Sequence, residues 1–279
     1  MTAVDCNKNK QQKEQMNLDT ISFTVTAPGA GGTAMAAVAG DSLQIRNGAK
    51  ASLILCLAMW TNGQVTPGYT QLLWPSGHDL VRGVRYRNQV LQPDNKVPLG
   101  APLRFRAQDP LTLLEVGSAT AGDVETAHML MFYEDLPGVD AHMINMATLR
   151  KRGVSNLTVE DSTTAAAAST YGGPRALNVG SDLLKADTEY ALLGAVIGAN
   201  CGALTVRGVD SGNLRVAIPG LTQDANWTSN WFGLLSEAND LPCIPVFNSA
   251  NRAGIFVENV TNELLTAVPF SLNMVQLSP

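Results

Sequence analysis

Short apolar runs, each ended by turn residues, recur along almost the whole chain. Ile21, Phe23 and Val25 alternate with Ser22 and Thr24 at a period of two, which is typical of a half-buried β-strand. Turns follow at short intervals, a spacing that favours a β-sandwich or jelly roll. The first half contains eight strand candidates, at residues 21–25, 42–46, 51–61, 69–74, 80–87, 103–106, 111–116 and 127–133.

The second half repeats this pattern. No stretch in it has sustained amphipathic helical spacing. Its eight strand candidates are residues 176–179, 189–197, 204–207, 214–218, 231–235, 244–247, 255–258 and 264–277. The chain is therefore predicted to be all-β, with two tandem eight-stranded jelly-roll β-sandwiches.

The stretch between the halves differs in composition. Met143, Met146 and Leu149 have helix-compatible spacing, and the cations at 150–152 followed by Gly153 are typical of a helix C-terminus. The small-residue run at 162–174 then predicts a flexible connector. The expected organisation is an arm at 1–18, a first jelly roll at 19–138, a helix and connector at 139–174, and a second jelly roll at 175–279.

Parts of the two halves match when they are set side by side. Segment 53–63 resembles 191–202, and segment 98–116 resembles 241–260. Either an internal duplication or chance similarity between two all-β domains accounts for these matches. The matched pairs are Leu55 with Leu193, Asn62 with Asn200, Phe105 with Phe247, Leu113 with Ile255, Leu114 with Phe256, and Leu130 with Leu272.

Composition limits the classes of function. Apolar residues make up 45% of the chain, whereas charged residues make up only 15%, against about 25% in a typical soluble domain. A surface with so little charge favours contact with neighbouring molecules, although an ordinary extracellular β-protein also fits. The net charge of −5 argues against a protein that coats nucleic acid, so no specific nucleic-acid binding is expected.

Cysteine usage and hydropathy give two further expectations. Cys6, Cys56, Cys201 and Cys243 lie far apart without a CxxC spacing, which favours buried reduced thiols over two disulfides. The first sixteen residues are polar, so no signal peptide is expected. The longest apolar run falls short of the roughly 18 residues that a membrane helix requires.

The residue types needed for catalysis are not grouped in the sequence. His78, His128 and His142 do not have metal-ligand spacing, and neither an HExxH, a GxSxG nor a phosphate-loop motif occurs. Adjacent acidic pairs such as Glu134-Asp135 fit a solvated surface better than a catalytic cleft. We therefore expect a protein that is not an enzyme, with no cofactor, no metal and no catalytic residues.

Two basic features are candidates for contact with phosphates or lipid headgroups. Lys8, Lys10 and Lys13 lie in the polar arm and could bind either neighbouring subunits or an anionic membrane surface. The basic triplet at 150–152 could do the same, but a helix C-terminus explains it without a ligand.

Two tryptophans close in sequence are a separate candidate. Trp227 and Trp231 could form an exposed sugar-binding platform, or they could pack in a core or subunit contact. The second interpretation is favoured.

Two tandem strand-rich halves, a polar arm, a helix-bearing connector, low charge and the paired segments at 53–63/191–202 and 98–116/241–260 resemble one known family. This is the family of small double-jelly-roll major capsid proteins of tailless icosahedral, membrane-containing bacteriophages. The resemblance covers nearly the whole chain and is architectural, because no signature motif accompanies it.

The resemblance implies a virion location and a capsid function. Three chains would form a homotrimer of pseudo-hexagonal outline, and trimers would self-assemble into an icosahedral shell. The arm would run beneath neighbouring capsomers or along an internal lipid membrane, where Lys8, Lys10 and Lys13 would meet anionic headgroups. Minor capsid proteins are further partners that the resemblance admits.

Three alternatives stay open. The first is another virion component, such as a spike or minor coat protein. The second is a carbohydrate-binding or adhesin β-sandwich protein, which Trp227 and Trp231 would favour. The third is a jelly-roll enzyme of the cupin type, against which the scattered histidines argue.

Overall fold

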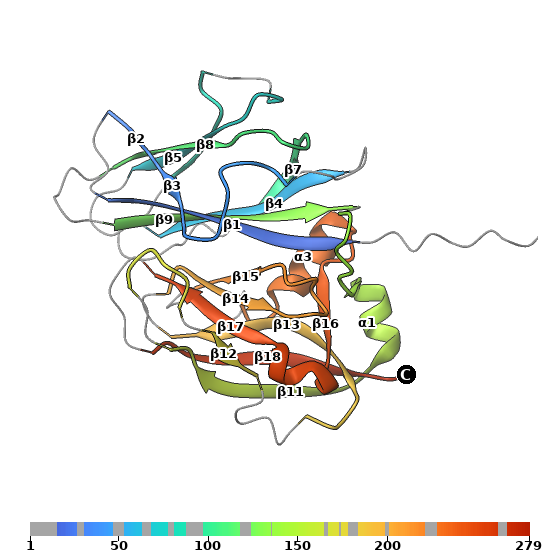
Figure 1. Cartoon of the computed structure of the whole chain (residues 1–279). Helices are drawn as coiled ribbons and strands as arrows, with labels where there is room; N and C mark the ends of the chain where they lie inside the picture. The colour runs from blue at the N-terminus through green and yellow to red at the C-terminus, as the bar shows by residue number, and fades with distance from the viewer. Residues whose placement is uncertain are drawn as a thin grey trace, which may run out of the picture.

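In the part of the chain that the structure describes, the strands form four antiparallel sheets, two in each half of the sequence (Figure 1). The architecture is therefore all-β, as predicted. The computed structural model describes residues 16–26, 31–46, 53–62, 68–77, 81–87, 97–117, 124–134, 136–164, 167–172, 174–177, 184–198, 201–220, 228–261 and 267–279.

The first unit is a sandwich of two sheets. One sheet has the strand order β3-β1-β9-β4-β7, and the other has the order β2-β8-β5-β6. The bounds are β1 (Asn17–Thr26), β2 (Thr33–Ala34), β3 (Ala36–Ala37), β4 (Ile54–Asn62), β5 (Tyr69–Leu73), β6 (Val84–Arg87), β7 (Val97–Phe105), β8 (Thr112–Val116) and β9 (Val124–Tyr133).

The second unit is built in the same way. Its sheets have the orders β10-β16-β13-β18-β11 and β12-β17-β14-β15. The bounds are β10 (Met143–Ile144), β11 (Gly153–Ser162), β12 (Arg175–Ala176), β13 (Glu189–Ile197), β14 (Ala203–Arg207), β15 (Val216–Pro219), β16 (Ile244–Asn248), β17 (Phe256–Val260) and β18 (Pro269–Leu277).

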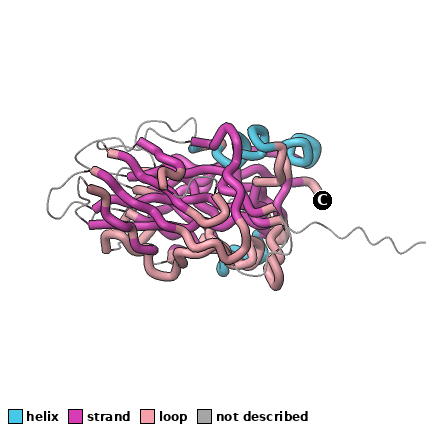
Figure 2. Tube along the Cα trace, turned by 90° about the horizontal axis from the view of Figure 1, so that it is seen from above, coloured by secondary structure: helices cyan, strands magenta, loops and turns pink. Residues whose placement is uncertain are grey.

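The two units have the same strand order. When β2 and β3 are counted as one interrupted strand and the two-residue β10 is left out, the strands of each unit, ranked along the chain, run 1-8-3-6 in one sheet and 2-7-4-5 in the other. This is the order of a jelly-roll-like sandwich, in which sequential strands alternate between the two sheets except for the fourth and fifth, which are neighbours in one sheet. Figure 2 shows the strands of both units running in roughly the same direction, with the helices gathered towards one end.

Each unit also has a β-bulge at the same place. The pairing of β4 with β9 shifts between Cys56 and Ala58, and the pairing of β13 with β18 shifts between Leu192 and Gly194. The third strand therefore carries one extra residue opposite the eighth strand in both units. This shared irregularity, together with the strand order, gives a residue-by-residue match between the two units.

That match tests the pairs proposed from the sequence. Phe105 and Phe247 do lie at equivalent positions. Phe105 pairs with Ile54 and Phe247 pairs with Tyr190, and each of these partners precedes the bulge of its own strand by the same number of residues. The pair Leu130 with Leu272 is wrong by one residue, because the register equates Leu272 with Met129.

A one-residue shift turns a side chain to the other face of the sheet, so matching leucines by identity misassigned the faces. The pair Leu55 with Leu193 is also displaced: the bulge equates Leu193 with Leu57. That shift is two residues, which keeps the predicted face.

The predicted helix is confirmed as α1 (Met146–Arg152), and the residues that follow it correct the predicted connector. Asn145 caps α1 by accepting a hydrogen bond from the Thr148 amide at 2.8 Å, and the Gly153 amide donates to Leu149 at the other end. The next ten residues form β11, which pairs along β18. The sequence missed this strand because most of its residues are exposed, so it shows no apolar alternation.

Three other expectations are corrected. Residues 231–235 were predicted to be a strand but belong to helix α3 (Trp231–Asn239), since Trp231, Phe232 and Leu235 are buried on one side of a helix. Within residues 42–46 only Gln44 makes a β-bridge, to Pro110. The arm is shorter than predicted, because β1 begins at Asn17.

We predict that Gly194→Ala, beside the second bulge, destabilises the fold. A Cβ atom at this position would lie 1.9 Å from the Thr228 carbonyl oxygen, whereas a Cβ at Gly254 would have nothing within 4 Å. The free energy of unfolding measured in urea should fall by about 1–3 kcal/mol for Gly194→Ala and change little for the control Gly254→Ala. Equal stability of the two variants would contradict the close packing at Gly194.

Candidate functional site: the joint between the two units

The central sheet of the first unit is buried on both faces. On β9, Met129 and Met131 pack in the core of the first unit, whereas Leu130 and Phe132 belong to the core of the second. The same division occurs on β1 and β4. We call the side that meets the second unit the joint face; its apolar residues are Leu18, Leu55, Leu57, Ala58, Trp60, Leu130 and Phe132.

Two tryptophans, one from each unit, anchor the joint. The rings of Trp60 on β4 and Trp231 on α3 form a T-shaped pair, with centroids 5.8 Å apart and an interplanar angle of 83°. Each indole is satisfied, since the Trp60 nitrogen donates to the Gly202 carbonyl at 2.9 Å and that of Trp231 donates to the Ala217 carbonyl at 3.1 Å. Both rings are at most 1% exposed, so the joint contains a desolvated aromatic pair.

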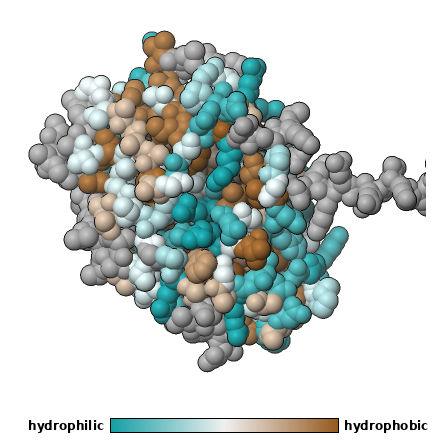
Figure 3. Space-filling model, viewed as in Figure 1, coloured by the Kyte–Doolittle hydropathy of each residue, from teal (hydrophilic) through white to brown (hydrophobic). Residues whose placement is uncertain are grey.

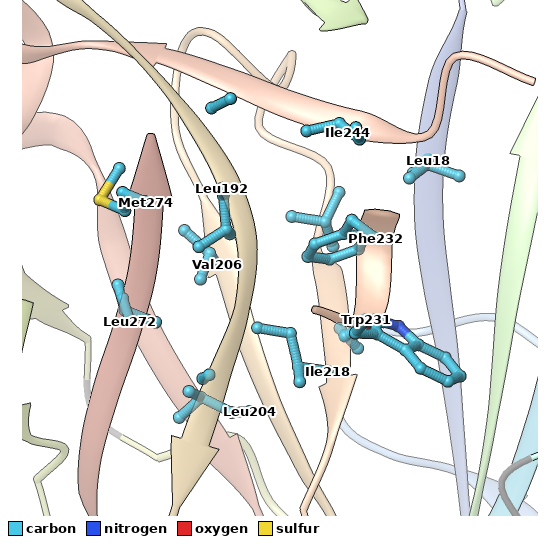
Figure 4. Packing of buried hydrophobic residues seen from close by; sticks show 14 of the residues in the cluster. Leu18, Leu192, Leu204, Val206, Ile218, Trp231, Phe232, Ile244, Leu272 and Met274 are labelled. Carbon is cyan, nitrogen blue, oxygen red and sulfur yellow. Dashed lines mark hydrogen bonds between the residues drawn. The ribbon is translucent and has the colours of Figure 1, made fainter. Parts of the chain in front are cut away.

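Around these rings the second unit supplies an apolar surface. Figure 4 shows Phe232 of α3 and Ile244 of β16 facing Leu18 of β1. These residues belong to the same cluster as the interior of the second sandwich. The core of the second unit therefore continues onto the joint face of the first, and a joint of this kind holds the two units as one body.

Strand β15 is the part of the second unit that lies beside β1 (Figure 1). The Ala217 amide donates to Thr20 Oγ1 at 3.2 Å, and the Arg215 amide donates to Asp19 Oδ1 at 3.3 Å. β1 is thus held through side-chain acceptors rather than through a β-ladder.

A network of ion pairs closes one edge of the joint. Arg215 pairs with Glu258 at 3.0 Å and lies 3.7 Å from Asp41, and its guanidinium stacks on the Tyr171 ring at 3.9 Å from the centroid. Arg215 is only partly exposed, with a side-chain exposure of 24%. Because Asp41 belongs to the first unit and Glu258 to the second, Arg215 links the two units electrostatically.

Asp41 itself is held by several donors. The Tyr171 hydroxyl donates to Asp41 Oδ2 at 2.8 Å, and the Ser22 amide donates to the same oxygen at 2.7 Å. Burial nevertheless raises the pKa of Asp41 to about 6, because the hydrogen bonds and the Arg215 charge do not fully offset the loss of hydration. Burial likewise raises the pKa of Asp19, against the opposing charge of Arg46.

His128 is completely enclosed in the joint. Its ring stacks on Trp60 with centroids 5.4 Å apart, Nδ1 lies 2.9 Å from Ser22 Oγ, and Nε2 lies 3.2 Å from Thr126 Oγ1. Burial lowers its pKa to about 3, so the imidazole is neutral near pH 7. A neutral ring donates through one nitrogen and accepts through the other, which matches a hydroxyl on each side.

The contact between Ser22 and His128 superficially resembles a nucleophile and its base. Both residues are 0% exposed, so a substrate cannot reach them in this arrangement. Within the described part of the chain, moreover, no three or more His, Cys, Asp or Glu side chains are placed to hold a metal ion. The polar groups of the joint are therefore interpreted as structural.

The residues proposed from the sequence have varied outcomes. Lys8, Lys10 and Lys13 lie outside the described residues, as do His78 and Trp227. Trp231 is a core residue of the joint rather than part of an exposed sugar platform, so the favoured interpretation is confirmed for this residue.

The third histidine and the basic triplet make contacts within the second unit. His142 Nδ1 lies 3.3 Å from Glu189, and Arg152 pairs with the same carboxylate at 2.7 Å. Arg150 pairs with Glu237. The triplet thus forms the last turn of α1, as predicted, and two of its cations already have carboxylate partners.

The cysteines within the described residues are free and buried. Cys56, Cys201 and Cys243 form no disulfide, as the spacing predicted, whereas Cys6 lies outside the described residues. Burial raises the pKa of the Cys201 thiol to about 12, so this thiol is unreactive.

The joint is not predicted from the sequence, although the sequence contains one signal of it. The run at 53–60 is apolar without alternation, and a strand that is apolar on both faces is typical of a sheet covered on both sides. Two-sided burial of β4 could have been predicted from this pattern, but the identity of the covering surface could not.

Similarity between this chain and known proteins is found among solved structures. No protein-family model and no curated protein matches the chain. Similar solved structures include the PBSX exported protein XepA, with a TM-score of 0.26 and 10% identity over 91% of this chain and 85% of that one.

Two further structures are capsid proteins. The major capsid protein P2 from bacteriophage PM2 has a TM-score of 0.22 and 8% identity over 94% of this chain and 98% of that chain. The STIV MCP has a TM-score of 0.20 and 10% identity over 95% and 97%. The jelly-roll-like fold of the two units is assigned from their strand order and not from these TM-scores.

Among the described helices, none combines the length and apolar character needed to cross a membrane.

We predict a pH dependence that belongs to His128. Its pKa is lower in the folded state than its ordinary value of 6.5, so the unfolded chain binds the proton first, and stability is lost as the pH falls from about 6.5 towards 3. The advantage of the wild type over His128→Asn in free energy of unfolding should shrink across this window, by up to about 1.4 kcal/mol per pH unit.

The wild type must be compared with His128→Asn because the titration of Asp41 changes stability with pH in the opposite direction. Its raised pKa means that the folded state holds a proton between its ordinary value of 3.8 and about 6, which adds stability as the pH falls through this range. Both proteins share this contribution, so it cancels in the difference. A difference that stays constant from pH 7 to pH 4 would contradict the assignment to His128.

Proposed function

We propose that this chain is a major capsid protein that assembles, as homotrimers of pseudo-hexagonal outline, into the icosahedral shell of a virion. The observation that carries the proposal is the rigid pairing of two units with the same strand order in one chain. Three such chains supply six similar units, which is the number needed to fill a hexagonal position in a shell. Heterologous contacts that close into a ring are one of the two ways in which identical chains associate.

The joint supports this proposal physically. A shell subunit must keep its outline while many neighbours press on it, and a tandem of sandwiches on a flexible linker would not. Here the joint face, the Trp60 and Trp231 pair and the Arg215 network fix the placement of the two units.

The surface composition is a second support. On the face shown in Figure 3, polar and apolar residues are interspersed, and the chain as a whole is only 15% charged. Low charge reduces the repulsion between identical copies packed closely together. It fits a protein that spends its functional life surrounded by copies of itself.

The partners follow from the same proposal. Neighbouring capsomers and minor capsid proteins would contact the sides of the trimer, and an internal lipid membrane would lie beneath it. Lys8, Lys10 and Lys13 are proposed to contact the anionic headgroups or the next capsomer through their charge.

A spike or minor coat protein is a second candidate, since the same tandem of sandwiches would suit it. The sugar-binding alternative loses half of its sequence support, because Trp231 is 0% exposed and donates a hydrogen bond inside the protein.

We predict that the purified full-length chain forms trimers. Sedimentation velocity over a hundredfold range of concentration should show a trimer that becomes dominant at the upper end, and electron microscopy should show shells or sheets under assembly conditions. A chain that stays monomeric throughout, and binds a glycan array tightly, would overturn the capsid proposal in favour of the sugar-binding one.

Removal of residues 1–15 should separate folding from assembly. This deletion stops before Asn17 and Leu18, which are 0% exposed in β1, so the thermal unfolding midpoint should stay within about 2 °C of the wild type. Trimers should persist, while the yield of shells falls at least fivefold. The charge-reversed variant K8E/K10E/K13E is the matched control, and it should reproduce the loss if the lysines carry the contact. Full assembly by both variants would remove the arm from the proposal.

A further inference from the structure

The register of the two units identifies a surface that corresponds to the joint face. Both bulges lie in the pairing of the third strand with the eighth, so they align the two units residue by residue. In this alignment, the residues of the first unit that contact the second unit correspond to residues on the outside of the second unit. We call this surface the outer face. The matched pairs are Leu18 with Asn156, Thr20 with Thr158, Ser22 with Glu160, His128 with Ser271, Leu130 with Asn273, and Trp60 with Val196.

The two faces differ in what covers them. Leu18 and Trp60 on the joint face are 0% and 1% exposed. Of their equivalents on the outer face, Asn156 is exposed and Val196 is 40% exposed. The central part of β11 points alternate side chains outward, and β11 lies at the edge of its sheet. The outer face thus has the same backbone framework as the joint face, but the described residues leave much of it uncovered.

β15, which covers the joint face together with α3 and β16, has an equivalent in the first unit. β15 is the fifth strand of the second unit, lies at the edge of its sheet and is preceded by Arg215. The fifth strand of the first unit is β6, which is likewise at a sheet edge. A cation lies near its start too, since Arg82 stands two residues before Val84.

The β6 edge is exposed and carries a chemistry that complements the outer face. Val81 is 82% exposed, and Arg82 and Arg85 are exposed beside it. The outer face offers the exposed carboxylate of Glu160 and the half-exposed Val196. In the joint, Arg215, just before the corresponding strand, lies 3.7 Å from Asp41 of the first unit and also pairs with Glu258 of its own unit.

We propose that the outer face of one copy binds the β6 edge of a second copy, so that the contact between chains repeats the contact between the two units within a chain. This rests on the proposed function and identifies the partner surface within it. The contact is heterologous, because different surfaces meet, and such a contact closes into a ring when its rotation allows. Three copies joined in this way would alternate internal joints with contacts between chains.

The composition of the outer face sets the character of this contact. Where the joint face has Leu18, Leu130 and Trp60, the outer face has Asn156, Asn273 and Val196. An apolar joint is permanent and forms as the chain folds, whereas a polar face can stay in water until a partner arrives. The charge pair of Glu160 with the β6 arginines then contributes orientation and specificity.

Charge reversal tests this contact directly. Glu160→Arg and Arg85→Glu should each raise the dissociation constant of the trimer at least tenfold in sedimentation equilibrium at low salt. The double variant E160R/R85E should return to within threefold of the wild type, because the pair is restored with its signs exchanged. The control is Lys185→Glu, an exposed charge reversal in the loop before β13, which should leave the dissociation constant unchanged.

Cross-linking provides a second measurement that does not depend on the stability of the trimer. In a Cys6→Ser background, E160C/R85C treated with a short bis-maleimide should give covalent dimers and trimers, and the pair K185C/R85C should not.

The outcomes separate the two proposals. If the wild type is trimeric but E160R and R85E trimerise as well as it does, and E160C/R85C gives no cross-linked product, the outer-face contact is wrong while the capsid proposal stands. If the wild type is monomeric under all conditions, the capsid proposal and this contact both fail.

Discussion

Burial of the central sheet of the first unit on both faces is the constraint on which the rest of the structure depends. A strand in such a sheet is buried at successive positions, and β9 is accordingly buried from Glu125 to Tyr133. One face of the sheet completes the first sandwich, and the other completes the second. Because the same strands serve both cores, the two units cannot separate without exposing the joint face to water, and this makes the tandem one rigid body.

The polar groups in the joint act as specificity elements. A purely apolar joint would tolerate small sliding motions, but His128, Asp41 and Arg215 find their partners in only one placement of the units. The cost of moving a buried, hydrogen-bonded group away from its partners is larger than the net gain of making the bond. The polar network therefore selects the register, while the tryptophans and leucines supply most of the stabilisation.

The two units share a framework but divide their roles. The equivalent face of each sandwich is apolar where the chain must hold itself together and polar where it is exposed. If the chain builds a shell, this division explains how one fold can make a permanent contact and a reversible contact with the same geometry. The difference lies in a few side chains, such as Trp60 at one position and Val196 at the other.

Much of the strand layout could be predicted from the sequence, because alternation and turn residues are local properties. β13 was predicted with its observed bounds, and α1 was found from its basic last turn and following glycine. The failures were elements whose state is set by distant contacts. β11 has no apolar alternation because it lies exposed at a sheet edge, and the apolar run at 231–235 suits a strand equally well until packing against β13 and Trp60 makes it a helix. Matching of the halves failed by one residue for a related reason, since leucine identity does not report which face of a sheet a side chain occupies.

By itself, then, the sequence determined that this chain is all-β, tandem in organisation, low in charge and without grouped catalytic residues. Those properties follow from residue types and their spacing, which are readable one segment at a time. Only the tertiary structure decided that the core of the second sandwich extends onto the central sheet of the first, that His128 and Trp231 lie in this joint, and which face of the second unit is left uncovered. These depend on which surfaces meet across large separations in the chain, and the free energy of burying them belongs to the pair of surfaces rather than to either segment alone.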